Sequence, residues 1–131
     1  MTYVKIANQQ FEATISGSQY DRNWGGRNSK TITCALSYEE AKALFISNTP
    51  WYIVYVPEPY EDEQGNVITP DPEIYDNSEY CVAGAITDTR NGKVEIKMGK
   101  LTDIEKLYIQ LENAVTEEEL ETAYVEGVNS L

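Results

Sequence analysis

Carboxylates are the most abundant side chains in this sequence that could do chemistry, because 22 of the 131 residues are Asp or Glu. Their densest group lies in the stretch YEDEQGN, where Glu61, Asp62 and Glu63 precede Asn66. Oxygen ligands of this kind suit calcium, but the stretch lacks the alternating ligands and the distal glutamate of an EF-hand loop. Two interpretations stay open, an adventitious calcium site and a plain solvated loop.

Residue types exclude several other kinds of reaction centre. Histidine is absent from the sequence, which removes Ser–His and Cys–His nucleophile pairs and the commonest zinc ligand. Cys34 and Cys81 lie in apolar alternating runs that are typical of small buried side chains, and two cysteines alone cannot form a standard structural zinc site. Gly25-Gly26 is too short for a phosphate-binding loop. We therefore expect no metal, no cofactor and no catalytic residue.

A second candidate site is the stretch YDRNWGGRNSK, in which basic residues surround a tryptophan and two glycines. We expect Trp24 to fold over a sheet, with Gly25-Gly26 allowing the chain to reverse. Arg22 and Arg27 would then face the solvent or pair with carboxylates. The alternative is a loop that contacts a partner, since Arg and Trp are common anchors of interfaces.

The acidic residues are concentrated in parts of the chain. The formal net charge is −12, and residues 58–79 contain eight acidic residues and no basic one. Such a charge argues against general affinity for nucleic acid or for an anionic membrane. Solvated faces are the simplest explanation. The sharper alternative is a surface that imitates nucleic acid or meets a basic partner.

Tyrosines flank this acidic segment and suggest a contact surface. The chain has ten tyrosines and two tryptophans, and both types are enriched in protein interfaces because they combine a large contact area with a polar tip. Packing in or beside the core is their alternative role. The candidate partner-binding residues of the two stretches are Arg22, Trp24, Arg27, Tyr60, Glu61, Asp62, Glu63, Asp71, Glu73, Tyr75 and Asp76.

Alternating apolar residues predict the strands that must hold these stretches, at 3–6, 11–15, 31–36, 51–56, 80–88 and 94–98. We expect residues 16–28 to form a loop and Asn91-Gly92 to form the turn between the last two strands. Residues 57–79 contain four of the five prolines. We expect them to form a long exposed loop with a short hairpin near Val67 and Ile68, or else to be locally disordered.

Helical signals predict two further elements. A capping box at 37–40, Ser followed by Glu at the third position, begins a short helix. Similar boxes at 102–105 and 116–119 predict a C-terminal helical hairpin within 101–131. The expected fold class is α+β. It comprises an antiparallel sheet of five to six strands, one inserted short helix and the C-terminal helical hairpin, in a single domain over 1–131.

Several stretches together resemble one protein family. They are DRNWGGRNSKTIT, SYEEAKALF, WYIVY, YDNSEYCVAGAITDTRNGKVEIKMGK and LTDIEKL, and they cover roughly residues 11–110. The family that they resemble consists of small proteins encoded in phages and prophages of gut Gram-positive bacteria, often near tail and lysis genes. Its shared stretches are typical of a fold and include no catalytic residue. The resemblance implies a phage origin and a protein that is not an enzyme.

Two functions of different classes follow. The first is a virion-associated protein of the tail or baseplate, since small β-rich domains with an exposed extension suit repeated assembly. The alternative is an inhibitor of host defence, such as an anti-CRISPR protein, which would offer carboxylates to a channel that binds a phosphate backbone. The expected partner is accordingly a phage structural protein or a host defence effector, and a homo-oligomer is compatible with the aromatic content.

The expected location is the host bacterial cytoplasm, with incorporation into the virion under the first function. The stretch MTYVKIANQQ lacks the charged and apolar segments of a signal peptide. No apolar run approaches the length that spans a bilayer. Together with the net charge of −12, these observations lead us to expect contact with neither membranes nor nucleic acid.

Overall fold

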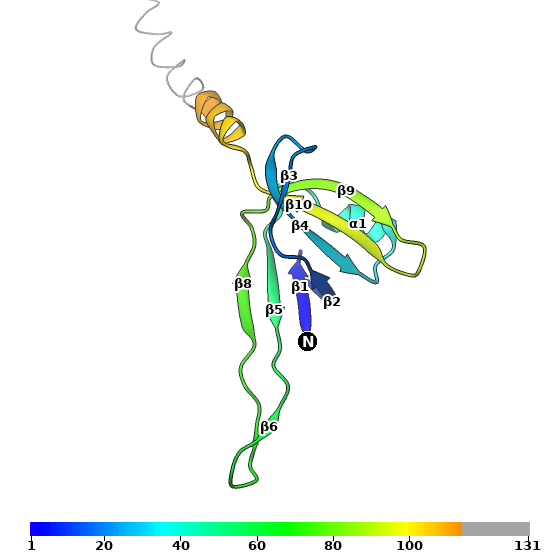
Figure 1. The fold of residues 1–131 in the computed structure, drawn as a ribbon, viewed down its shortest axis with the longest axis vertical. Helices are drawn as coiled ribbons and strands as arrows, with labels where there is room; N and C mark the ends of the chain where they lie inside the picture. Colours follow the sequence, from blue (N-terminus) through cyan, green and yellow to red (C-terminus); the bar gives the residue numbers. More distant parts are fainter. Residues whose placement is uncertain (114–131) are drawn as a thin grey trace, which may run out of the picture. The chain divides into compact units, whose positions relative to one another are not determined.

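A computed structural model describes residues 1–113 of the protein, and residues 114–131 lie outside this description. The chain divides into two compact units, Met1–Lys100 and Leu101–Leu131. The first unit contains ten strands and one helix (Figure 1). In chain order these are β1 Thr2–Ile6, β2 Gln9–Ile15, β3 Gln19–Asp21, β4 Arg27–Cys34, α1 Tyr38–Leu44, β5 Trp51–Tyr55, β6 Tyr60–Glu61, β7 Val67–Ile68, β8 Glu73–Asp76, β9 Val82–Asp88 and β10 Val94–Gly99.

Eight strands form one antiparallel sheet, in the order β8-β5-β1-β2-β4-β10-β9 with β3 paired to β4 beside this path, while β6 and β7 form a separate pair. The α+β class and the antiparallel sheet are confirmed, whereas the expected number of five to six strands is wrong. The additional strands, β3 and β8, lie in segments 16–28 and 57–79, which we expected to be loops. They have three and four residues, too few for a clear alternation of apolar and polar positions.

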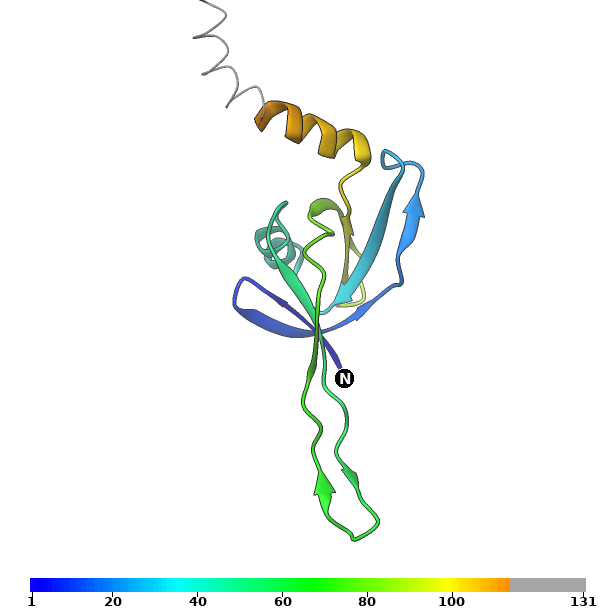
Figure 2. The ribbon, with the colours of Figure 1, turned by 90° about the vertical axis from the view of Figure 1, so that its left-hand side faces the viewer.

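The sheet turns a corner at β2, and the core lies inside this corner. Residues 9–12 of β2 pair with β1, and residues 13–15 pair with β4. The strands on the two sides of β2 therefore run in different directions (Figure 2), and their inner faces pack together as in orthogonal sheet packing. Both sides supply the largest fully buried side chains, which are Val4, Ile6, Trp51, Ile32, Val94, Ile96 and Met98.

The inserted helix α1 begins at a capping box, as expected. The Glu40 amide donates to the Ser37 hydroxyl (3.1 Å), and the Ser37 amide donates to the Glu40 carboxylate (3.3 Å). Ala41 and Phe45 are buried, and the helix packs against β9 and β10. Burial of this face stabilises a helix that is too short to be stable alone.

The predicted hairpin of β9 and β10 is confirmed, but its turn is longer than the expected Asn91-Gly92 turn. Asp88 lies opposite Val94, so five residues connect the strands. The left-handed backbone conformations fall on Arg90 (φ 61°) and Gly92 (φ 85°), and not on Asn91. The Thr89 amide donates to the Lys93 carbonyl (3.1 Å), so this bond closes the turn around residues 90–92 instead of Asn91-Gly92 alone.

In the second unit, residues 103–113 form a helix. Its predicted capping box is present, because the Glu105 amide donates to the Thr102 hydroxyl (3.2 Å) and the Thr102 amide donates to the Glu105 carboxylate (2.9 Å). The second helix of the predicted C-terminal hairpin, with its box at 116–119, lies outside the described residues. Among residues 1–113, no helix has the length and apolar character that crossing a membrane requires.

Candidate functional site

The segment 57–79 forms most of a long two-stranded β-ribbon that projects beyond the sheet (Figures 1 and 2). We call residues 51–79 the acidic ribbon. Two paired segments build it: β5 pairs with β8 near the sheet, and β6 pairs with β7 near the tip. The expected short hairpin at Val67 and Ile68 is confirmed, and the rest of the expected loop is a β-ribbon.

Prolines explain why the ribbon is paired in two pieces. Tyr55 lies opposite Glu73, and Tyr60 lies opposite Ile68, so four residues separate the paired pieces on each strand. These interruptions contain four prolines, which have no backbone N–H to donate to a ladder. Because the interruptions have equal length, the register is the same on both sides. The four prolines are Pro57, Pro59, Pro70 and Pro72.

The tip of the ribbon is a closed turn organised by Asp62. One carboxylate oxygen of Asp62 accepts hydrogen bonds from the amides of Asn66 (2.8 Å) and Gln64 (2.9 Å). These backbone donors, that of Asn66 above all, lower the pKa of Asp62. Gly65 supplies the positive φ (78°) that the turn requires. Within residues 1–113, no group of three or more His, Cys, Asp or Glu side chains is arranged to hold a metal ion.

Buried contacts fix the base of the ribbon. The Trp51 indole N–H donates to the Tyr80 carbonyl (2.9 Å), and the Asn77 amide donates to the Trp51 carbonyl (3.0 Å). Lys30 donates to the Asn77 side chain (2.7 Å) and lies 4.7 Å from the centre of the Tyr80 ring. Tyr80, which we expected to begin a strand, instead closes a turn before β9, since its amide donates to the Asn77 carbonyl (3.0 Å). The ribbon therefore leaves the sheet in a defined direction.

Beyond this base, the ribbon exposes apolar and acidic side chains together. Its exposed large hydrophobic residues are Tyr55, Tyr60, Val67, Ile68, Ile74 and Tyr75. Lys100 lies 3.5 Å from Glu79 at the base, and no ion pair within residues 1–113 involves an acidic residue of 58–76. Exposed apolar groups beside unpaired charges are typical of a surface that meets a partner.

Hydrogen bonds set the protonation of two groups on β8. The Tyr75 hydroxyl donates to the Glu73 carboxylate (2.6 Å), and this bond raises the pKa of Tyr75. Ser78, whose amide donates to the Asp76 carboxylate (2.8 Å), lowers the pKa of Asp76. Both effects favour a neutral phenol and a charged carboxylate at this edge.

The structure places the predicted contact residues in two regions rather than one. Eight of them lie along the acidic ribbon, and three lie in or beside the turn between β3 and β4, elsewhere in the sheet (Figure 1). Ile74, which is 64% exposed, was not among the predicted contact residues. The two apolar residues in EIYD were the available signal, although this stretch is only four residues long and follows Pro70 and Pro72.

The turn at residues 22–26, which we call the Trp24 turn, folds back over the sheet as expected. Gly25 and Gly26 both adopt a φ of 69°. The Trp24 ring covers two glycines, since a Cβ atom at Gly84 would lie 2.5 Å from the ring and one at Gly99 would lie 2.8 Å from it. Because Gly84 and Gly99 have no side chains, their backbones form a flat surface against which the indole packs.

Arg27 belongs to this packed turn and does not face the solvent, which was one of its two expected placements. Its side chain is buried, and its guanidinium lies 4.9 Å from the centre of the Trp24 ring. It also donates to the carbonyls of Trp24 (2.9 Å) and Lys100 (3.1 Å). Arg22 is exposed, as expected. The Trp24 turn is thus built mainly for packing.

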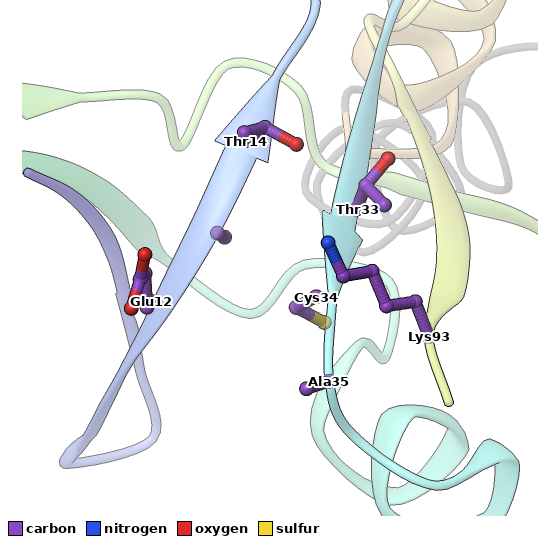
Figure 3. Close-up of a pocket in the computed structure, with 7 residues that line it drawn as sticks. Glu12, Thr14, Thr33, Cys34, Ala35 and Lys93 are labelled. Carbon is purple, nitrogen blue, oxygen red and sulfur yellow. The ribbon is translucent and has the colours of Figure 1, made fainter. Parts of the chain in front are cut away.

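A cavity of about 310 Å³ lies where β2 separates from β4 (Figure 3). Thr14, Thr33 and Cys34 line it, with Lys93 extending across β4 and Glu12 on the far side. Burial raises the pKa of the Cys34 thiol, so this thiol stays protonated and is a weak nucleophile.

Comparisons of the chain with protein-family models, with curated proteins and with solved structures give no match.

Proposed function

We propose that the protein acts without catalysis, through protein–protein contacts of the acidic ribbon, as an accessory component of a phage virion at or near the tail. One observation carries this proposal. A β-ribbon that is anchored by buried contacts at its base exposes six large hydrophobic side chains along its length. A monomer gains no stability from such exposure, whereas an assembled particle can cover it. The resemblance of the sequence to phage proteins encoded near tail genes supports the same assignment.

The ribbon suits assembly because it is pre-organised. A contact element that is already ordered loses little conformational entropy on binding, so more of the contact free energy appears as affinity. Strand pairing and the turn at Asp62 hold the ribbon, and the contacts of Trp51 and Asn77 fix its direction. An extended element of this kind can lie in a groove of a neighbour or complete its sheet.

Mass spectrometry of purified virions tests this function. We expect the protein in stoichiometric amounts in particles from a phage that encodes it. A variant that replaces residues 56–72 with Asn-Gly loses the exposed Tyr60, Val67 and Ile68 and should be depleted from the particles. It should still fold, because Tyr55 and Glu73 form a pair that a two-residue turn can close. Circular dichroism and thermal unfolding of the purified variant must match those of the parent. Virions that contain no parent protein would exclude this function.

The second candidate is an inhibitor of a host nuclease effector, and the charge of the ribbon favours it. Residues 58–79 carry eight acidic side chains and no basic one, and the lowered pKa values of Asp62 and Asp76 keep their charges at mildly acidic pH. Such a protein would occupy a channel that binds a phosphate backbone. It would be absent from virions, would bind the effector in a salt-sensitive manner, and would lose binding on charge reversal of Glu61, Asp62 and Glu63.

A further inference from the structure

We propose that the outer edge of β8 binds an extended segment of a partner protein as an additional antiparallel strand. We further propose that this segment carries two apolar residues between two basic residues. This inference rests on the proposed function and deepens it, because it names the chemistry of the partner that the ribbon meets.

The register of β8 shows which backbone groups are available. Because the Asn77 amide donates to the Trp51 carbonyl, residues 73, 75 and 77 direct their backbone groups toward β5. The hydrogen bonds on the opposite edge of β5 show the same alternation, since the Val56 amide donates to the Met1 carbonyl (2.8 Å) on the side away from β8. Ile74 and Asp76 therefore direct their N–H and C=O groups away from the sheet. β8 ends the sheet on this side, so these four groups face no neighbouring strand within the described residues.

The other end of the sheet is less open. β9 is the last strand there, but the segment that follows α1 covers its beginning. The Asn48 amide donates to the Cys81 carbonyl (2.8 Å), and the Ala83 amide donates to the Ser47 hydroxyl (3.0 Å). The β8 edge is consequently the better of the two for adding a strand.

Cross-strand neighbours on β8 predict the two central residues of the bound segment. On one face of the sheet, Tyr3, Val54 and Ile74 form a row across three strands. On the other face, Ile53 and Tyr75 end a similar row. Ile74 is 64% exposed and Tyr75 is 52% exposed. Apolar residues opposite both would extend the rows and cover them.

The flanking positions require basic residues. Glu73 and Asp76 lie at the two ends of β8, and Asp76 accepts a hydrogen bond from the Ser78 amide (2.8 Å) that lowers its pKa and favours its charged form. Opposite charges directly across a strand pair are favourable. The segment should therefore place Lys or Arg opposite each of these carboxylates.

A second copy of this chain fits the edge poorly. Antiparallel pairing of two β8 strands joins residues whose backbone groups both face outward, so Asp76 of each copy would lie opposite Ile74 or Asp76 of the other and never opposite a basic residue. Pro72, which lacks an N–H, limits the edge at its beginning. Proline and charge are devices by which natural sheets prevent self-association. Here they disfavour pairing with an identical strand and favour pairing with a basic segment.

Selection from a yeast-displayed library of random peptides, with the purified full-length protein as bait, tests this inference. We expect the enriched peptides to share a basic–apolar–apolar–basic pattern. Double charge reversal with Glu73→Lys and Asp76→Lys should change the enriched flanking residues from basic to acidic. The matched control, Glu39→Lys with Glu95→Lys, makes the same charge change at two exposed positions outside the acidic ribbon and should leave the selected pattern unchanged. No enrichment, or a pattern that β8 reversal does not alter, would refute the inference.

Amide hydrogen exchange locates the bound peptide. With the most enriched peptide, exchange at Ile74 and Asp76 should slow at least about tenfold, whereas exchange at Tyr75, whose amide already faces β5, should change little. Ile74→Pro removes one outward N–H without breaking the β5 ladder and should weaken binding, while Ile74→Val should preserve it. Slowing at sites away from β8 would contradict strand addition.

The two proposals can fail separately. If virions lose the protein on deletion of the ribbon but no peptide pattern depends on β8, the inference about the edge is wrong and the assembly function stands. If β8 selects the expected pattern but virions contain no parent protein, the edge binds a partner of another kind and the assembly function is wrong.

Discussion

The Trp24 turn and the acidic ribbon contain similar types of residue, but the first packs on the sheet and the second is exposed. Both connect strands, both contain residues that favour turns, and both carry aromatic and charged side chains typical of interfaces. Yet the Trp24 ring rests on Gly84 and Gly99, and Arg27 is buried beside it. The ribbon leaves Tyr60, at 56%, and other large side chains exposed.

The difference lies in what the rest of the fold offers. Two glycines on adjacent strands create a flat surface that the indole of Trp24 can cover, and Arg27 closes the contact with hydrogen bonds to two carbonyls. The ribbon has no such surface because prolines and a fixed register carry it away from the sheet. An aromatic residue in a loop is therefore a candidate for partner binding only where the fold offers no surface against which its ring can pack.

The largest expected effect comes from removing the anchor of the Trp24 turn. Trp24→Ala should lower the free energy of unfolding by about 3 kcal/mol, because a large side chain is lost from a packed site. Tyr60→Ala, at an exposed position of the ribbon, should change it by less than about 0.5 kcal/mol. Urea denaturation followed by circular dichroism measures both. Equal effects would contradict the distinction between a packed turn and an exposed ribbon.

A somewhat smaller effect is expected at the surface that receives the indole. Gly84→Ala should destabilise the protein by about 1–3 kcal/mol, because the new methyl group would lie 2.5 Å from the Trp24 ring and must displace it. In the double variant with Trp24→Ala the collision is absent, so the combined loss should be smaller than the sum of the single losses. Additive losses, measured by urea denaturation, would show that the two residues do not interact.

A substitution at the base of the ribbon should weaken the pairing of β8 with β5 and leave the rest of the sheet unchanged. Asn77 is 4% exposed, and its side chain accepts from Lys30 and donates to the Tyr75 carbonyl. Asn77→Ala should cost about 1–2 kcal/mol, since Lys30 loses its acceptor in a partly buried site. Native-state hydrogen exchange should quicken at the β8 amides that pair with β5 and remain unchanged in β10. Uniform quickening across the sheet would mean that the ribbon is not held separately at its base.

The smallest effect is a dependence on pH beside the Trp24 turn. A hydrogen bond from Lys97 (2.6 Å) lowers the pKa of Asp21. A carboxylate whose pKa is lower in the folded state contributes stability above its unfolded pKa of about 3.9, and this contribution is lost as the pH falls through the folded value. Asp21→Asn should therefore lower the melting temperature slightly at neutral pH and leave it unchanged in strong acid. A difference that persists in acid would assign the effect to something other than this charge.

The sequence by itself determined the features that depend on near neighbours. The capping boxes at Ser37 and Thr102 formed as predicted, because each needs only residues three positions apart. The hairpin of β9 and β10 and the reversal at Gly25-Gly26 follow from local alternation and from glycine's freedom at positive φ. The same local patterns predicted the α+β class with an antiparallel sheet.

The tertiary structure alone decided which of the two candidate regions is exposed. The indole of Trp24 is half-buried because Gly84 and Gly99, distant in sequence, are brought beneath it by strand pairing. Ile74 is an exposed edge residue because β8 pairs on one side only, which a four-residue stretch after Pro72 cannot reveal. Burial and edge position depend on contacts between distant segments, and a single sequence does not encode these contacts in any short pattern.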